Sequence, residues 1–383
     1  MNHRKGRYDV QSLKTACEGR WREIFGALIK NPAFHAAMDA NGKKLGPCPV
    51  HGGKTKFRLF SDWEQKGGGI SNDEDPKALT NGINMIMWVN NQDFITVCKN
   101  IEDYLGGTFR EEEMSPQQRA ALAKRAREIE EKRKAEQAQE DRKNRDRLNK
   151  VWQTSLDNNS PEALPLRKYL VNRGLDAFGL PETMRYHPAL PYSDNEENFL
   201  GTFPGIISLV TDVDGKPVTL HRTFLTEDGR KAPVDEPKKL MGYVKLENDM
   251  RGTGIKMGEI GRILHVAEGL ETILSVMTSI NETSAMSAIN SNNLAALVVQ
   301  EQVEIVVIWA DNDRVNPRTG YAAGLHAAES LANVLRGIGI KAFIMLPNRE
   351  IPDHAKSVDW NDILVSEGAR VIRREYERIR QQF

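Results

Sequence analysis

An alternation of strand-like and helix-like segments over residues 261–383 constrains the fold more than any other feature of the chain. Short runs of β-branched and apolar residues at 263–267 and 303–310 predict buried strands, and a helical pattern follows the first of them. A long helical pattern over 321–336 then precedes a further strand at 342–346. Strands that alternate with helices predict a parallel sheet of the α/β class, whose ligands bind at the carboxyl ends of the strands.

Acidic residues stand directly after two of these predicted strands. Glu268 follows the first strand, and Asp311 and Asp313 follow the second. If the two strands are neighbours, the three carboxylates converge, and two carboxylates about 4 Å apart repel by roughly 4 kcal/mol at an effective dielectric of about 20. Such a cluster requires a proton or a divalent cation, and a set of oxygen ligands favours Mg²⁺ or Mn²⁺. The alternative is that each acid only caps a helix.

A third acidic segment, VDWNDIL, contains Asp359 and Asp362. Residues three apart share one face of a helix, so both carboxylates could approach the same cation. Asp359 is equally a good cap for a short helix that begins after it. The sequence leaves these two interpretations open, as further metal ligands or as a helix cap.

Composition divides the whole chain into five segments. They are a small mixed module with glycine-rich turns (1–110), a charged linker helix (111–150), an α+β region (151–260), the α/β domain (261–350) and a C-terminal helical segment (351–383). Within the first module, residues 16–29 predict one amphipathic helix. The charged helix is either a solvated spacer or a basic arm for nucleic acid. Its acidic residues nearly balance its basic ones, which favours the spacer.

Charge and composition exclude several classes of protein. The 53 basic and 53 acidic residues cancel, so total charge does not indicate a polyanion ligand. Their distribution is uneven: residues 1–150 hold 28 basic and 22 acidic residues, a net charge of +6, and the remainder carries −6. No apolar run approaches the length of a membrane span, and no signal peptide is visible. The three cysteines, Cys17, Cys48 and Cys98, cannot build a disulfide framework, so a reducing, cytoplasmic setting is expected.

The α+β region contains two predicted strands, at 205–211 and 218–224, and the second of them opens a basic segment. The cations of this segment are Arg222, Lys231, Lys238 and Lys239. A guanidinium suits bidentate phosphate contact and an ammonium suits a point contact, so these residues are candidates for binding nucleotide or template phosphates. Acidic residues interleave with them, and an ordinary solvated loop is the alternative.

The motif EGLET after one strand and ADND after the next resemble the Toprim (topoisomerase–primase) domain. Upstream lie GPCPVHGGKTKFRLF, KYLVNRGL, MRYHPALPY and HRTFLTEDGRKAPVDEPKKL, and downstream lies DWNDIL. In this joint order the segments are similar to the Toprim-containing primases of phages, plasmids and integrative elements. The resemblance covers both ends and the middle of the chain.

That resemblance implies a multidomain α/β protein: a Toprim parallel sheet flanked by helices, an α+β primase subdomain, a helical linker and a zinc-ribbon module. It also implies RNA primer synthesis on single-stranded DNA from ribonucleoside triphosphates, with Mg²⁺ or Mn²⁺ as cofactor. Carried over to this chain, Glu268, Asp311 and Asp313 are the metal-binding and catalytic acids. The sequence contains no ATPase motif, so a replicative helicase would be a separate partner.

The zinc-ribbon module departs from the pattern of that family. Cys48 and His51 offer half of a zinc site, but a closed structural site needs four ligands. Ser71 and Glu74 stand where the second pair of cysteines is expected. Zinc is therefore a doubtful cofactor, and we expect the module to fold without stoichiometric zinc.

Two other functions use the same features of the sequence. A Toprim nuclease would employ the same acids with water as the nucleophile. A replication accessory protein would bind single-stranded DNA without catalysis. The basic segment and the ribbon-like module favour the primase over the nuclease, and the presence of all three acids favours an enzyme over the accessory protein.

Overall fold

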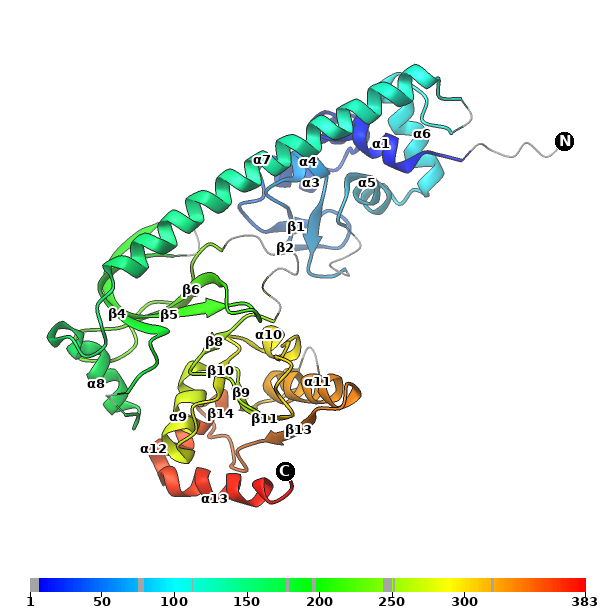
Figure 1. Cartoon of the computed structure of the whole chain (residues 1–383). Helices are drawn as coiled ribbons and strands as arrows, with labels where there is room; N and C mark the ends of the chain where they lie inside the picture. Colours follow the sequence, from blue (N-terminus) through cyan, green and yellow to red (C-terminus); the bar gives the residue numbers. More distant parts are fainter. Residues whose placement is uncertain are drawn as a thin grey trace. The chain divides into compact units, whose positions relative to one another are not determined.

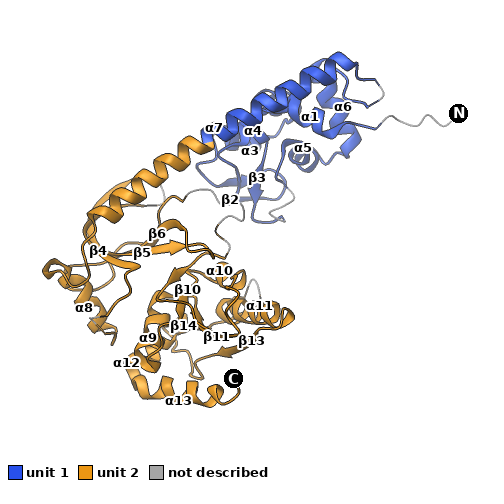
Figure 2. Cartoon of the chain, in the orientation of Figure 1, with its two compact units in different colours: residues 1–136 blue, residues 137–383 orange. Residues whose placement is uncertain are grey.

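Two compact units make up the chain, residues 1–136 and residues 137–383 (Figure 2). The computed structural model describes residues 7–74, 79–111, 113–176, 179–194, 198–243, 250, 252–317 and 320–383. Figure 1 labels elements of both units and colours them along the sequence from the N-terminus to the C-terminus. The mixed α/β, multidomain fold class predicted from the sequence is confirmed.

The first unit is a three-stranded antiparallel sheet, in the order β1-β2-β3, surrounded by short helices. The strands are β1 (Gly46–Cys48), β2 (Gly52–Leu59) and β3 (Gly69–Ser71). The helices are α1 (Val10–Cys17), α2 (Trp21–Leu28), α3 (Pro32–Asp39), α4 (Trp63–Lys66), α5 (Gly82–Asn90) and α6 (Phe94–Leu105). An aromatic core fills the unit, and Phe25, Phe34, Phe57 and Trp63 are fully buried in it.

The single helix predicted over residues 16–29 is wrong, because the structure forms two helices there, α1 and α2. Glu18 ends α1 in an extended conformation, and Gly19 adopts a positive φ of 75°. A residue in the left-handed backbone conformation cannot continue an α-helix, and glycine adopts that conformation most easily. The amphipathic pattern itself is confirmed, since Trp21, Ile24 and Phe25 of α2 face the core.

A single helix, α7 (Pro116–Thr154), spans the boundary between the two units. None of its residues is fully buried, and ion pairs one turn apart, such as Lys124 with Glu128 and Lys132 with Glu136, line its surface. Such exposed pairs each contribute about 0.3–0.5 kcal/mol. The prediction of a charged, solvated helix is confirmed.

The second unit begins with an antiparallel sheet in the order β4-β5-β6-β7. Its elements are η1 (Pro161–Ala163), α8 (Leu164–Asn172), β4 (Met184–Ser193), β5 (Phe199–Thr211), β6 (Pro217–Phe224) and β7 (Lys238–Leu240). One face of the sheet packs on α8 and the following domain, whereas Leu220 and Phe224 on the other face meet Leu148 and Trp152 of α7. The sequence predicted β5 and β6 but not β4.

A five-stranded sheet follows, in the order β13-β11-β9-β10-β8, and its first four strands are parallel. The strands are β8 (Ile255–Lys256), β9 (Ile263–Ala267), β10 (Ala285–Ser287), β11 (Ile305–Trp309) and β13 (Lys341–Met345). The helices are α9 (Leu270–Ile280), α10 (Ser291–Ala295), α11 (Ala323–Gly337), α12 (Trp360–Glu367) and α13 (Ala369–Arg380). The predicted parallel sheet is therefore confirmed.

Helices cover both faces of this sheet (Figure 1). Val306 and Ile308 of β11 pack in one cluster with residues of α10 and α11. Val307 and Trp309, which alternate with them, pack in the other cluster with residues of α9, α12 and α13. Because both faces are buried, the strands are continuously apolar, as in other parallel sheets.

A short two-stranded sheet, β12 (Asn312–Asp313) with β14 (Ser357–Val358), lies beyond the end of β11. Among the helices in the described part of the chain, none is both long enough and apolar enough to cross a membrane.

Candidate active site at the edge of the parallel sheet

The register of two central strands places Glu268 and Asp311 at the same edge of the sheet. Strands β9 and β11 are parallel neighbours, with Ala267 opposite Trp309. Glu268 follows Ala267 directly, and Asp311 follows Trp309 by two residues. Both acids therefore leave the carboxyl edge of the sheet, where ligands of this fold class bind.

A third segment reaches the same edge through the pairing of β12 with β14. Asn312 lies opposite Val358 in this antiparallel pair, so Asp311 and Asp359 continue from it on adjacent strands. Asp359 caps α12 and accepts a hydrogen bond from the backbone N–H of Asp362, whose carboxylate accepts one from the N–H of Asp359 in return. Asp359 thus joins the acids at the edge, whereas Asp362 is an exposed member of a capping box.

Burial and mutual repulsion raise the proton affinity of these carboxyl groups. Burial first, and then Asp359, Glu268 and Asp313, raise the pKa of Asp311 to about 8. Burial followed by Asp313 raises the pKa of Glu268, and burial is also the main cause of the raised pKa of Asp359. The edge therefore concentrates negative charge that only a proton or a cation can neutralise.

Hydrogen bonds fix two of the carboxylates in place. The Thr272 hydroxyl lies 3.2 Å from Asp311 Oδ1, and the backbone N–H of Gly324 donates to Asp313 Oδ2 at 2.7 Å. A Cβ at residue 324 would lie 2.9 Å from the same Oδ2 and from the backbone oxygen of Asp311, so only glycine allows this approach. The first turn of α11 thus holds Asp313 beside Asp311.

The donor set fits a hard divalent cation. Each of Glu268, Asp311, Asp313 and Asp359 offers carboxylate oxygens, the ligand type that Mg²⁺ and Mn²⁺ prefer. Their ligand atoms are not gathered within 4.8 Å of one another. Among the residues that the structure describes, the one group of His, Cys, Asp and Glu side chains that meets that limit is Cys48, His51 and Asp73. Burial and the raised pKa of Asp311 are the observations that favour a cation at the edge.

Two lysines of the predicted basic segment converge on one buried carboxylate, Glu271 of α9. Lys238 Nζ lies 2.6 Å and Lys231 Nζ 3.3 Å from its oxygens, and the Tyr169 hydroxyl donates to it at 2.6 Å. Burial alone would raise the pKa of Glu271, but Lys238 and Lys231 hold it well below its usual range. Lys238 also lowers the pKa of Glu268, so it lies within electrostatic range of the acidic edge.

The other two residues of the basic segment lie on the opposite face of their sheet. Arg222 pairs across strands with Lys239, and Ile207 stands on the same face. The Arg222 guanidinium lies over the Phe224 ring and donates to a backbone carbonyl, with its centre 5.2 Å from the ring centroid. Lys239 donates to the backbone oxygen of residue 193 and is mostly buried. The structure therefore brings together Lys231 and Lys238 but not the whole set.

Sequence reasoning missed three residues of this site, namely Tyr169, Glu271 and Thr272. The last two belong to the quoted motif EGLET, in the first turn of α9, where their contacts could have been suspected. An acidic residue on a helix in an otherwise apolar stretch is a signal for a buried ion pair. Tyr169 gave no such signal, because its partner lies 102 residues away along the chain.

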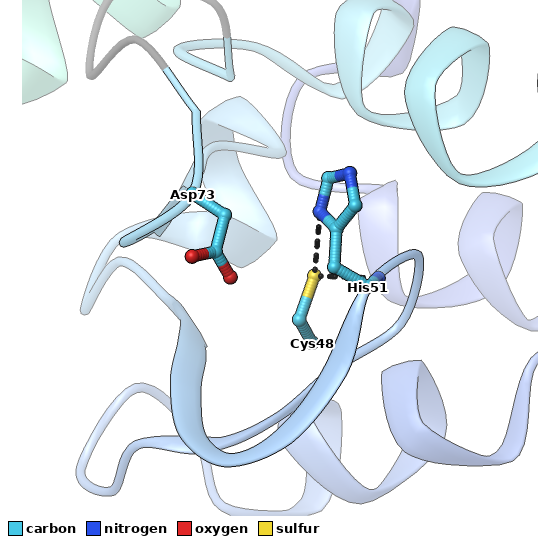
Figure 3. Close-up of side chains that lie close together, drawn as sticks. All are labelled: Cys48, His51 and Asp73. Carbon is cyan, nitrogen blue, oxygen red and sulfur yellow. Dashed lines mark hydrogen bonds between the residues drawn. The ribbon is translucent and has the colours of Figure 1, made fainter.

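In the first unit, Cys48 and His51 lie together at the turn between β1 and β2, with 3.5 Å between Sγ and Nδ1 (Figure 3). Asp73, which sequence reasoning did not select, lies beside them and completes the tight group of ligand atoms. Ser71 donates to Cys48 Sγ at 3.7 Å. The sequence supplied only two of the four ligands that a closed zinc site needs, Cys48 and His51. The structure adds the Asp73 carboxylate as a third.

Three segments of the chain match known domain families. Residues 263–370 match the "Toprim domain", residues 43–79 match the "Zinc-binding domain of primase-helicase", and residues 142–251 match a "Domain of unknown function (DUF7146)". A comparison with curated proteins gave no match.

Several solved primase structures are similar to the chain at low identity. The zinc-binding and RNA polymerase domains of the Aquifex aeolicus primase are 14% identical, over 93% of this chain and 85% of that one, with a TM-score of 0.38. The RNA polymerase domain of the Mycobacterium tuberculosis primase is 17% identical, over 60% and 80%, with a TM-score of 0.36. The primase fragment of the bacteriophage T7 primase-helicase protein is 18% identical, over 54% and 73%, with a TM-score of 0.33.

At such low TM-scores these structural similarities carry no weight in assigning the protein. The matched segments of sequence and the parallel sheet with its acidic edge are the features that relate the chain to these families. The chain therefore has a mixed α/β architecture in which one segment matches the Toprim domain and an earlier segment matches the zinc-binding domain of primase-helicase.

Proposed function

We propose that the chain is a DNA primase that synthesises short RNA primers on single-stranded DNA. The observation that carries this proposal is the acidic edge of the Toprim sheet, where Glu268 and Asp313 help raise the pKa of Asp311 and Lys238 lies within electrostatic range of Glu268. Nucleotidyl transfer needs this combination, because the enzyme must hold a polyanionic triphosphate and neutralise the charge that develops during transfer.

The acids of the edge would hold one or two Mg²⁺ ions. Bound there, the cations supply charge neutralisation on the triphosphate and lower the pKa of the primer 3′-hydroxyl. Glu268, Asp311 and Asp313 orient their oxygens from fixed strand ends, and Asp359 stands beside Asp311 as a further oxygen donor. The raised pKa of Glu268 also suits a group that accepts the proton of the attacking hydroxyl.

Lys231 and Lys238 are the cations that we propose for the triphosphate. Their side chains are about one-third exposed, so an incoming phosphate can reach their ammonium groups. Two lysines against one Glu271 carboxylate leave a net positive charge next to the acids. Glu271 and Tyr169 keep the lysines in one place, and this limits the entropy lost when a nucleotide binds.

The partners in this proposal are a single-stranded DNA template, ribonucleoside triphosphates and a separate replicative helicase. The net charge of +6 over residues 1–150 and the primase-helicase zinc-ribbon match support a template-binding role for the first unit. Replication of a mobile element is the setting that the resemblance suggests.

One assay separates this proposal from its alternatives. The full chain is incubated with single-stranded DNA, labelled ribonucleotides and Mg²⁺, and products are sized on a denaturing gel. New short RNA that depends on the template supports the primase. Shortened template without RNA would instead show a Toprim nuclease, and a template shift without any product would show a non-catalytic binding protein.

A further inference from the structure

The first unit brings three side chains of different chemistry together at one end of its small sheet. Cys48 ends β1, His51 stands in the following turn, and Asp73 follows β3, whose pairing with β2 returns the chain to the same place (Figure 3). Their ligand atoms all lie within 4.8 Å of one another. A thiol, an imidazole and a carboxylate are the three ligand types that proteins use for zinc.

The distance between sulfur and nitrogen fits a shared tetrahedral ion. Zinc–sulfur and zinc–nitrogen bonds of their usual lengths, at a tetrahedral angle, separate the two ligand atoms by about 3.6 Å. The observed separation of Cys48 Sγ and His51 Nδ1 is 3.5 Å. The two side chains therefore need no rearrangement to hold one zinc ion.

Contacts around the sulfur hold it in position. The backbone N–H of His51 donates to Cys48 Sγ at 3.2 Å, and the Ser71 hydroxyl donates to it at 3.7 Å. Cys48 is buried, whereas His51 and Asp73 are exposed, so the group opens to solvent on one side. Ser71, which stands where the family pattern expects a cysteine, thus contacts the sulfur and is not itself a thiol ligand.

A second carboxylate stands behind the histidine. His51 Nε2 lies 3.8 Å from Glu74 Oε1, and that oxygen accepts a hydrogen bond from the Trp88 indole at 3.0 Å. A histidine that binds a metal through Nδ1 carries its proton on Nε2, and a nearby carboxylate commonly receives that proton in a hydrogen bond. Glu74 is therefore placed to orient the His51 ring when Nδ1 binds a metal.

We propose that Cys48, His51 and Asp73 form a three-ligand zinc site whose fourth position is open to water. This arrangement differs from the closed four-ligand geometry that structural zinc sites usually have. Lys56 Nζ lies 2.8 Å from Asp73 Oδ1, and its positive charge weakens the attraction of the site for a cation. Zinc therefore binds reversibly and exchanges with solution.

Folding of the unit does not depend on this site. Its aromatic core contains Phe25, Phe34, Phe57 and Trp63, all fully buried, and of the three ligands only Cys48 belongs to that core. Fully burying each such side chain contributes about 1.5–3 kcal/mol. We therefore expect the zinc-free protein to stay folded, unlike small domains whose folding energy is metal-binding energy.

The test is a titration of the zinc-stripped full chain with Co²⁺, followed by displacement with Zn²⁺ in competition with a chromophoric chelator. We expect one Co²⁺ per chain, a thiolate-to-cobalt charge-transfer band and the visible bands of tetrahedral Co²⁺. Cys48→Ser should abolish the charge-transfer band, and Asp73→Asn should weaken Zn²⁺ binding at least about 10-fold. Lys56→Gln should tighten it. Circular dichroism of each variant checks the fold.

Matched controls keep the result specific. Cys98→Ala removes another buried thiol, whose pKa burial raises to about 12, and Asp103→Asn removes an exposed carboxylate elsewhere in the unit. Neither change should alter the Co²⁺ spectrum. The proposal is overturned if no charge-transfer band forms, if Asp73→Asn binds Zn²⁺ as tightly as the wild type, or if the zinc-stripped protein is unfolded. None of these readouts depends on primer synthesis, so the two proposals fail separately.

Discussion

The acidic edge of the Toprim sheet and the Cys48–His51–Asp73 group both gather potential metal ligands, but the chain builds them differently. The edge is made of carboxylates that strand register places at the end of a buried parallel sheet, and they raise one another's pKa. The N-terminal group mixes sulfur, nitrogen and oxygen at a surface turn, with two of its three residues exposed.

This difference shows at which of the two groups the loss of a charged side chain should also affect the stability of the fold. Near the edge, the buried Glu271 pairs with Lys231 and Lys238, whose side chains are about one-third exposed, so one substitution leaves charges without their partner. In the Cys48–His51–Asp73 group, His51 and Asp73 are exposed, and only Cys48 belongs to the aromatic core. Substitutions at the edge should therefore change catalysis or stability strongly, whereas those at the turn should change metal binding with little effect on folding.

The largest effect is expected for the acids themselves. Asp311→Asn and Asp313→Asn should each lower primer synthesis by about 100-fold or more, because each removes charge that the transferring phosphate requires. Thermal unfolding should show both variants as folded as the wild type. Asp362→Asn is the matched control: its carboxylate serves the cap of α12, so most activity should remain. Near-full activity of both edge variants would rule out this assignment of the site.

Glu271→Gln should lower the free energy of unfolding by about 1.5–3 kcal/mol, because it removes the charged partner of Lys231 and Lys238, whose side chains are about one-third exposed. Urea denaturation measures this loss. Glu304→Gln, which breaks the exposed pair with Arg262, should cost less than about 1 kcal/mol. Equal losses for the two variants would show that Glu271 is not coupled to the lysines as described.

Substitutions in the pair Lys231 and Lys238 should affect the KM for ribonucleotides differently from substitutions in the pair Arg222 and Lys239. Lys238→Ala and Lys231→Ala should raise the KM for ribonucleotides about 10-fold, since each removes a charged phosphate contact. Arg222→Ala and Lys239→Ala lie on the other face of the sheet and should leave this KM within about twofold. The reverse pattern would place the triphosphate on the α7 face.

A smaller effect is expected in the pH dependence of stability without metal. Folded Asp311, with a pKa of about 8, keeps a proton that the unfolded chain has lost, so stability should fall as pH rises from about 7 to about 8 and level off above that. The buried His221 and His265, with pKa values of about 4, are neutral in the folded protein, and in the unfolded chain, with their ordinary pKa of about 6.5, they are mostly neutral over this range. Melting temperatures in EDTA test this, and Asp311→Asn should flatten the decline. An equal decline in the variant would assign it to another group.

The acids at the edge of the sheet could be predicted from the sequence because the residues that indicate them lie next to each other in the chain. Glu268 and Asp311 each follow an apolar strand, and the rule for parallel sheets places such positions together. Asp359 gave only an ambiguous signal, because its approach to Asp311 depends on the short pairing of β12 with β14. Strand β4 was missed because Pro188 and Pro191 interrupt its pattern.

Contacts between distant parts of the chain were beyond sequence reasoning. Asp73 meets Cys48 only after β2 and β3 have paired, and nothing in the residues between them indicates that register. Strand register also decides why Lys231 and Lys238 lie apart from Arg222 and Lys239, and the sequence did not indicate that register. Arg222 and Lys238 lie on neighbouring strands, but which face each occupies follows from the pairing of Lys239 with Arg222.

The most direct test of the central claim is Mn²⁺ binding to the full chain, measured by electron paramagnetic resonance. The chain should bind Mn²⁺, and a non-hydrolysable ribonucleoside triphosphate should tighten that binding, because the triphosphate adds oxygen ligands beside Lys231 and Lys238. Asp311→Asn combined with Asp313→Asn should weaken Mn²⁺ binding at least about 10-fold, whereas Cys48→Ser should leave this nucleotide-dependent binding unchanged. Equal Mn²⁺ binding by the wild type and the double variant would contradict a cation site at the edge of the sheet.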